Sequence, residues 1–154
     1  MLSRQVHHAL KALLLLAAEP HSWHSTHQLA TAQDLPEPML EQLLLRLRRA
    51  GVLVARRGRL GGYRLARPAR ELSVAAVLAA LGESAEPAAV SGFKATAESD
   101  AMPLAPADQV TLALARRLER ARQQALAQSS LEDLLFDLRS AEATSGSEAG
   151  LLLG

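Results

Sequence analysis

The chain of 154 residues contains no cysteine, and this absence excludes several classes of site at once. Disulfide scaffolds, thiolate zinc fingers, cysteine-ligated iron–sulfur clusters and cysteine nucleophiles all need that side chain. Aromatic residues make up only 3% of the chain, which is too few for the base-stacking surface of an RNA-binding sheet.

Long apolar runs are missing as well. The run at 12–18 follows Arg4 and Lys11 and resembles a signal peptide, but it covers only seven residues. A membrane-spanning helix needs roughly 20. We therefore expect a buried helix, no membrane partner and a cytoplasmic protein.

Residues 1–82 carry the pattern of a mainly α-helical, winged helix-turn-helix domain. Apolar residues recur at helical spacing in three segments, and Pro36 and Gly51 are typical of the start and end of the third. Two short alternating stretches then flank a tip with three glycines, which predicts a two-stranded wing. The expected helices cover 3–18, a segment from Ser25 or Thr26 to about Ala32, 36–50 and a segment capped by Ser73, and the expected strands are 52–54 and 63–65.

The remainder divides into a linker or mobile loop at 83–107, a dimerisation region at 108–140 and a disordered tail at 141–154. A long helix over 108–128 has one apolar stripe, which needs a partner surface such as a second copy of the chain. Ser130 and Asp133 resemble a capping box that opens a short closing helix through Leu138. The stripe consists of Val110, Leu114, Leu118, Ala121 and Ala125.

The formal net charge of +1 conceals two opposite halves. Residues 1–82 hold eleven basic and five acidic side chains, or +6, whereas the rest holds six basic and eleven acidic ones, or −5. Nine arginines and no acid lie between Arg46 and Arg70. This block coincides with the end of the expected recognition helix and with the wing, so it favours binding to nucleic acid.

Three runs of sequence together resemble the Rrf2 family of bacterial transcription regulators. They are Met-Leu-Glu-Gln-Leu at 39–43, Leu-Arg-Arg-Ala-Gly-Val at 47–52 and Arg-Gly-Arg-Leu-Gly-Gly-Tyr-Arg-Leu-Ala-Arg-Pro at 57–68. The opening helix from His8 and the segment 129–134 are similar to the family as well. The resemblance covers residues 1–82 well and 108–138 loosely.

The resemblance implies a homodimer, with crossing long helices, that binds a palindromic operator in double-stranded DNA. It implies that Glu41 and Gln42 approach base edges in the major groove, where a carboxylate can accept from cytosine and glutamine can pair with adenine. Arg57 would enter the minor groove, while Arg59 and Arg46 contact phosphates. Tyr63 is expected to pack on the hairpin. The full expected DNA-binding set is Thr26, Pro38, Glu41, Gln42, Arg46, Arg57, Gly58 and Arg59.

Two departures from the family pattern matter. Pro36 and Pro38 stand at the start of the recognition helix, where the family usually has serine and an aromatic residue, so the operator sequence cannot be carried over. Many relatives hold an iron–sulfur cluster through three cysteines in the stretch that corresponds to 82–106, and this chain has none. We therefore expect no cluster, no other cofactor and no metal.

Histidines do not supply an obvious substitute for the cysteines. His21, His24 and His27 are spaced by three across an expected helix start, which lacks the regular geometry of a metal site, and a solvated loop is favoured. His7 lies near a position that supplies an iron ligand in some relatives. Acidic residues of the linker, namely Glu86, Glu98 and Asp100 with Ser99, could contact an unknown small-molecule effector.

The leading hypothesis is a dimeric, cluster-free DNA-binding repressor. The alternative is a winged-helix protein-interaction module that has lost operator binding, which the prolines at the recognition helix motivate. No catalytic motif appears in a recognisable context, so an enzyme is not expected.

Overall fold

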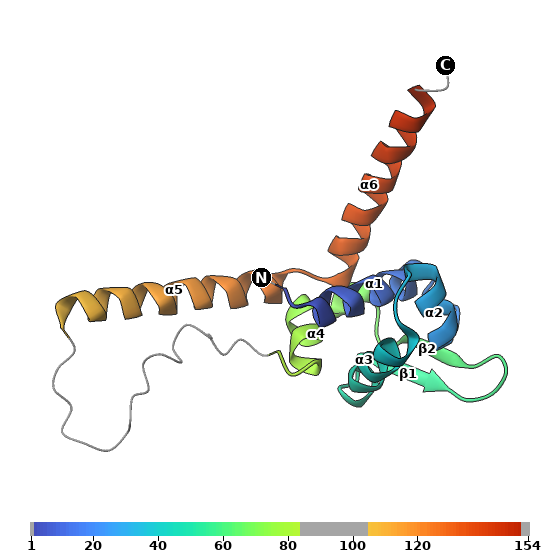
Figure 1. Cartoon of the computed structure of the whole chain (residues 1–154), viewed down its shortest axis with the longest axis horizontal. Coiled ribbons are helices and arrows are strands. Elements are labelled where there is room, and N and C mark those ends of the chain that lie inside the picture. The colour runs from blue at the N-terminus through green and yellow to red at the C-terminus, as the bar shows by residue number, and fades with distance from the viewer. Residues whose placement is uncertain (1, 84–104, 152–154) are drawn as a thin grey trace.

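The computed structural model describes residues 2–83 and 105–151, which form a mainly helical structure with one small hairpin (Figure 1). This architecture confirms the expected winged helix-turn-helix domain followed by a long helix. No helix in the described ranges combines the length and apolarity that crossing a bilayer requires. In chain order the elements are α1 (Arg4–Ala18), α2 (Thr26–Gln33), α3 (Glu37–Arg49), β1 (Leu53–Arg56), β2 (Gly62–Leu65), the 3-10 helix η1 (Ala69–Glu71), α4 (Val74–Ala80), α5 (Pro106–Gln128) and α6 (Leu131–Leu151).

Helix α1 lies at the centre of the domain and contacts α2, α3, α4, β2 and α6. Ser3 caps it, because its hydroxyl accepts a hydrogen bond from the Val6 amide at 3.2 Å and satisfies a free helix-terminal N–H. The predicted inward positions Val6, Leu10 and Leu13 are buried. The apolar run that resembled a signal peptide is thus the core helix of the domain.

Helices α2 and α3 form the helix-turn-helix. Of the two predicted caps of α2, Ser25 is the one that acts, in a capping box with Gln28, and Thr26 is the first helical residue. Helix α3 buries its predicted leucine stripe, and Gly51 adopts a positive φ of 79° after its last turn. There the Gly51 amide donates to the Arg48 carbonyl at 3.0 Å and the Val52 amide to the Leu47 carbonyl at 3.0 Å, which is a Schellman termination.

Strands β1 and β2 pair antiparallel, with Leu53 opposite Leu65 and Arg56 opposite Gly62. The strand β1 begins one residue later than predicted and extends to Arg56, because Val52 is used in the helix termination. His24 forms an isolated antiparallel bridge with Tyr63 of β2. The His24 amide donates to the Tyr63 carbonyl at 3.2 Å, and the Tyr63 amide donates to the His24 carbonyl at 2.8 Å.

The junction between α5 and α6 is fixed on the winged helix by backbone hydrogen bonds. The Val74 amide donates to the Ser129 carbonyl at 2.8 Å, and the Leu131 amide donates to the Leu72 carbonyl at 2.9 Å. Leu131 is fully buried in the core. The capping box that the sequence predicts is present, because Ser130 and Asp133 exchange hydrogen bonds at 2.8 and 3.2 Å.

The sequence predicted a disordered tail at 141–154, and this prediction is wrong for residues 141–151. Helix α6 continues to Leu151 instead of ending near Leu138, and it projects away from the domain (Figure 1). Alanine and glutamate favour a helix here, and the hydroxyls of Ser140, Thr144 and Ser145 donate to the carbonyl four residues earlier, which leaves the helix continuous. The expected linker at 83–107 lies mostly outside the described residues, as do Glu86, Glu98, Ser99 and Asp100.

Candidate nucleic-acid interface

The outer face of α3 presents the predicted recognition residues to solvent. Pro38, Glu41, Gln42 and Arg46 are all exposed, and their spacing of three or four residues places them on one side of the helix. The opposite side carries Leu40, Leu43, Leu44 and Leu47, which are buried. Because that core contact is continuous, α3 is held rigidly while its polar side stays free to meet a partner.

The wing supplies a second exposed surface next to α3, since α3 and β1 are in contact. Arg57, Gly58 and Arg59 are exposed at its tip. Gly58 has a positive φ of 106°, and the Gly61 amide donates to its carbonyl at 3.0 Å, which closes the turn. The Arg56 guanidinium donates to the Leu60 carbonyl at 2.6 Å and braces the tip from its base.

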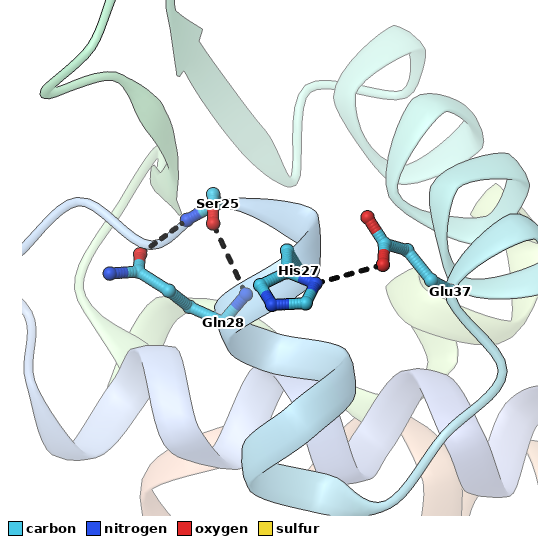
Figure 2. A network of polar contacts seen from close by, with 4 residues as sticks. All are labelled: Ser25, His27, Gln28 and Glu37. Atoms are coloured by element: carbon cyan, nitrogen blue, oxygen red, sulfur yellow. Dashed lines mark hydrogen bonds and ion pairs between the residues drawn. The ribbon is translucent and has the colours of Figure 1, made fainter.

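Polar contacts join α2 to the start of α3, as Figure 2 shows. The His27 imidazole lies 3.0 Å from the Glu37 carboxylate, while Ser25 and Gln28 complete the capping box. Both His27 and Glu37 are exposed, so the pair contributes little to the free energy of folding. Its value is geometric, because it links the first turn of α3 to the helix before it. Thr26, from the expected DNA-binding set, is half-buried at the first turn of α2.

Side chains of α1 position the two helices from behind. The Lys11 ammonium donates to the Gln33 carbonyl at 2.6 Å. A positive charge at this position stabilises α2, because the C-terminal end of a helix carries a partial negative charge. The His8 ring lies 3.3 Å from the Met39 sulfur. Partial burial lowers the pKa of His8, and the positive charges of His7, Lys11 and Arg4 lower it further, which favours the neutral ring beside α3.

Trp23 is a functional candidate that sequence reasoning missed. Its indole ring contacts two guanidinium groups of the wing, at 4.7 Å from that of Arg56 and 4.6 Å from that of Arg64. The register puts both arginines on one face of the hairpin, because Arg64 pairs with Val54, two residues before Arg56. The sequence shows this alternation, but nothing in it indicates that the loop tryptophan reaches the same face.

A close backbone approach completes this anchoring of the wing. A Cβ atom at Gly62 would collide with the backbone carbonyl of His24, and Gly62 also has a φ of 142°. Tyr63 is half-buried and packs against the core, whereas the sequence predicted packing on the hairpin. The wing is therefore fixed to the α1–α2 connection by backbone pairing and by the Trp23 ring.

The three histidines at positions 21, 24 and 27 have different partners and do not converge on one site. His24 lies 2.7 Å from the Glu19 carboxylate, His27 pairs with Glu37, and His21 lines a groove on another side of the domain. Within 2–83 and 105–151, no group of three or more histidine or acidic side chains is arranged to hold a metal ion.

Comparison with known proteins identifies this architecture. The sequence profile of Rrf2, described as iron-dependent transcriptional regulators, matches residues 2–137. The chain belongs to the Rrf2 family. It is 41% identical over 146 residues to a protein of Synechocystis sp. named as an HTH-type transcriptional regulator, slr0846, with 94% of each chain covered. It is 42% identical over 86 residues to the regulator IscR of Cereibacter sphaeroides, covering 54% of this chain and 56% of that one.

Solved structures agree with the Rrf2 assignment. T. potens IscR superimposes with a TM-score of 0.69 at 27% identity, covering 92% of this chain and 90% of that one. CymR, named the global cysteine regulator of B. subtilis, superimposes with a TM-score of 0.70 at 25% identity, covering 88% and 95%. These Rrf2 relatives are DNA-binding regulators of transcription and not enzymes, and the same coarse function applies to this chain.

The iron named in the family description finds no thiolate ligand in this Rrf2 protein. The whole chain lacks cysteine, and the described histidines are separated as above. A cysteine-held cluster therefore does not fit the residues present.

Proposed function

We propose that this Rrf2 protein is a homodimeric, cluster-free repressor that binds a palindromic operator in double-stranded DNA. One observation carries the proposal: the exposed face of α3 and the arginine tip of the wing lie on elements that contact each other, α3 and β1. A recognition helix can enter the major groove while an adjacent wing reaches the backbone or minor groove.

The roles follow from side-chain chemistry. Glu41 accepts from cytosine N4, and Gln42 pairs with adenine in the major groove. Arg57 enters the adjacent minor groove, whose negative potential is strongest where it is narrow. Arg46 and Arg59 bind phosphates. Thr26, Pro38 and Gly58 lie where the duplex backbone approaches closely.

The dimer is supported by α5, which has no buried residue within the described chain. Val110, Leu114 and Leu118 are 68%, 52% and 62% exposed on the predicted stripe. A second copy that covers this stripe would present two winged helices to two half-sites, about 34 Å apart for one turn of DNA. We further propose that the protein acts in the cytoplasm on the nucleoid and answers to a small-molecule effector.

The experiment that tests the proposal is a mobility shift on the DNA upstream of the protein's own gene, titrated with salt. Arg57→Ala should weaken binding about 10- to 100-fold, as expected for loss of one specific contact worth about 1–3 kcal/mol. Wild-type binding should fall steeply with salt, because phosphate contacts release counterions.

Arg70→Ala is the matched control, since it removes the same charge from η1, where Arg70 lies 3.9 Å from Glu71. It should bind nearly as wild type. Equal, sequence-independent binding by all three proteins would reject operator recognition. A stable protein partner recovered without any enriched DNA would instead support the interaction module that Pro36 and Pro38 suggest.

A further inference from the structure

A groove of about 780 Å³ lies between the C-terminal end of α1, strand β2 with the segment after it, and the first two turns of α6. None of the eight residues expected to contact DNA lines this groove. Its volume lies within the range that small-molecule sites occupy in proteins. The groove therefore needs an explanation other than operator binding.

Basic groups converge on the rim of the groove. Arg64, Arg67 and Arg139 line it from β2, the following segment and α6, against the single carboxylate of Glu132. Arg67 and Arg139 are exposed, and neither has a hydrogen bond or ion pair with any described residue. Such guanidinium groups are free to bind a carboxylate or related anion in a bidentate manner.

The floor of the groove is apolar. Leu65 and Leu135 form part of it, and Phe136 stands beside them with 71% of its surface exposed. Glu132, Leu135, Phe136 and Arg139 follow the helical spacing of three and four, so one side of α6 faces the groove. An aromatic ring next to free guanidinium groups suits a ligand with an apolar body and an acidic head.

We propose that this groove binds a small organic anion with an apolar, ring-containing body, and that Arg64 connects it to the wing. Arg64 is one of the residues that line the groove, and its guanidinium lies 4.6 Å from the Trp23 ring. A ligand that draws Arg64 toward its anionic group would disturb the contact that anchors β2. The assignment of the ligand as an effector rests on the proposed function, whereas its binding does not.

The test uses the full chain and two dyes that differ only by a sulfonate: 1-anilinonaphthalene-8-sulfonate and the neutral N-phenyl-1-naphthylamine. The sulfonate dye should bind at one molecule per chain. Combined Arg67→Gln and Arg139→Gln substitutions should weaken it about 5- to 30-fold, given that two charge-assisted contacts are lost in a partly hydrated site. The neutral dye should bind both proteins equally.

Arg4→Gln is the matched control, because it removes a similar exposed charge about 20 Å along α1 from the groove. It should leave sulfonate binding unchanged. Phe136→Ala should weaken both dyes by a similar factor. The fluorescence of Trp23, the only tryptophan in the chain, should change when the sulfonate dye binds.

Wild-type sulfonate affinity in the double arginine variant would overturn the proposal. So would a loss of DNA affinity by that variant without dye, which would make the groove part of the DNA interface. A change in its oligomeric state would make the groove a contact between copies and would likewise overturn it. If wild-type protein binds the dye as expected but no DNA, the repressor function fails while the anion site stands.

Discussion

The two halves of this Rrf2 protein differ in how completely they bury their own apolar surface. Among the described residues, the core extends from Val6 to Leu81 and receives only Leu131 and Leu135 from beyond it. Helix α5 has no fully buried residue: Leu126 near its end packs against the core, but three large apolar side chains stay exposed. The basic half thus buries most of its apolar surface within the described chain, whereas the acidic half leaves an apolar stripe exposed that the proposed dimer would cover.

Because of this difference, folding depends mainly on the core of the winged helix, whereas association of two copies depends on the stripe of α5. The winged helix is stabilised by its own leucine core, so changes at its surface affect binding rather than folding. The apolar stripe of α5 contributes to stability only when another surface removes it from water. Substitutions in the two halves should therefore produce different kinds of failure.

The largest effect is expected from Leu118→Glu on α5. A carboxylate in the proposed interface would be buried without a partner, so the dimer should dissociate. Affinity for a full palindromic operator should fall about 100-fold or more, because the two half-sites are no longer bound together. Analytical ultracentrifugation gives the oligomeric state, and fluorescence anisotropy gives the DNA affinity.

Arg116→Glu is the control for that change, because residue 116 lies on the opposite side of α5 from Leu114 and Leu118. It should remain dimeric. A Leu118→Glu protein that is still a dimer would show that α5 is not the interface. It would then contradict the claim that the second half needs another copy of the chain to cover its apolar stripe.

The next effect is expected within the basic half, at the wing. Gly62→Ala should lower the free energy of unfolding by about 3 kcal/mol, since the new Cβ collides with the His24 backbone at a positive φ. Gly58→Ala should cost only about 1–2 kcal/mol, because it has a positive φ but open space around it. Urea unfolding measures both, and equal losses would contradict a wing clamped to the α1–α2 connection.

A smaller effect is expected for Trp23. Trp23→Leu removes two cation–π contacts, each worth about 0.5–1 kcal/mol, and should lower DNA affinity about threefold to tenfold by loosening the wing. Trp23→Phe keeps an aromatic ring and should lose less. If both variants bind DNA as wild type while folding normally, Trp23 does not position the wing.

The smallest effect concerns Asp133, which caps the start of α6 next to the junction with the winged helix. Hydrogen bonds from the Ser130 amide and hydroxyl lower the pKa of this carboxyl. A lowered carboxyl pKa stabilises the fold above the unfolded value, and this stabilisation is lost as pH falls through the folded value. The melting temperature of Asp133→Asn should therefore lie below wild type at pH 6, and the difference should shrink as the pH falls below the ordinary carboxyl pKa value of 3.8. A constant difference would show that the charge is not responsible.

Much of the fold was predictable because local patterns determine it. The leucine spacing of α3, its termination at Gly51 and the Ser130–Asp133 box are all local, and the structure contains each. The predicted end of α6 was wrong, because serine and glycine suggested disorder while alanine and glutamate favour a continuing helix. Its projection beyond the domain could not be read from periodicity.

The candidate site was only partly predictable. Exposure of Glu41, Gln42 and Arg57 follows from the pattern of their neighbours. The contact of Trp23 with both Arg56 and Arg64 depends on a loop reaching a hairpin about 30 to 40 residues away in sequence, which no local pattern encodes. The groove shared by α1, β2 and α6 likewise exists only in three dimensions.

Genome-wide mapping of the DNA bound by the protein in cells tests the central claim most directly. A basic half that reads DNA and an acidic half that pairs two copies predict enriched palindromic sites, with half-sites about one helical turn or a multiple apart. Those sites should disappear for Leu118→Glu. The absence of any enriched sequence, or enrichment of single half-sites that Leu118→Glu retains, would contradict the account.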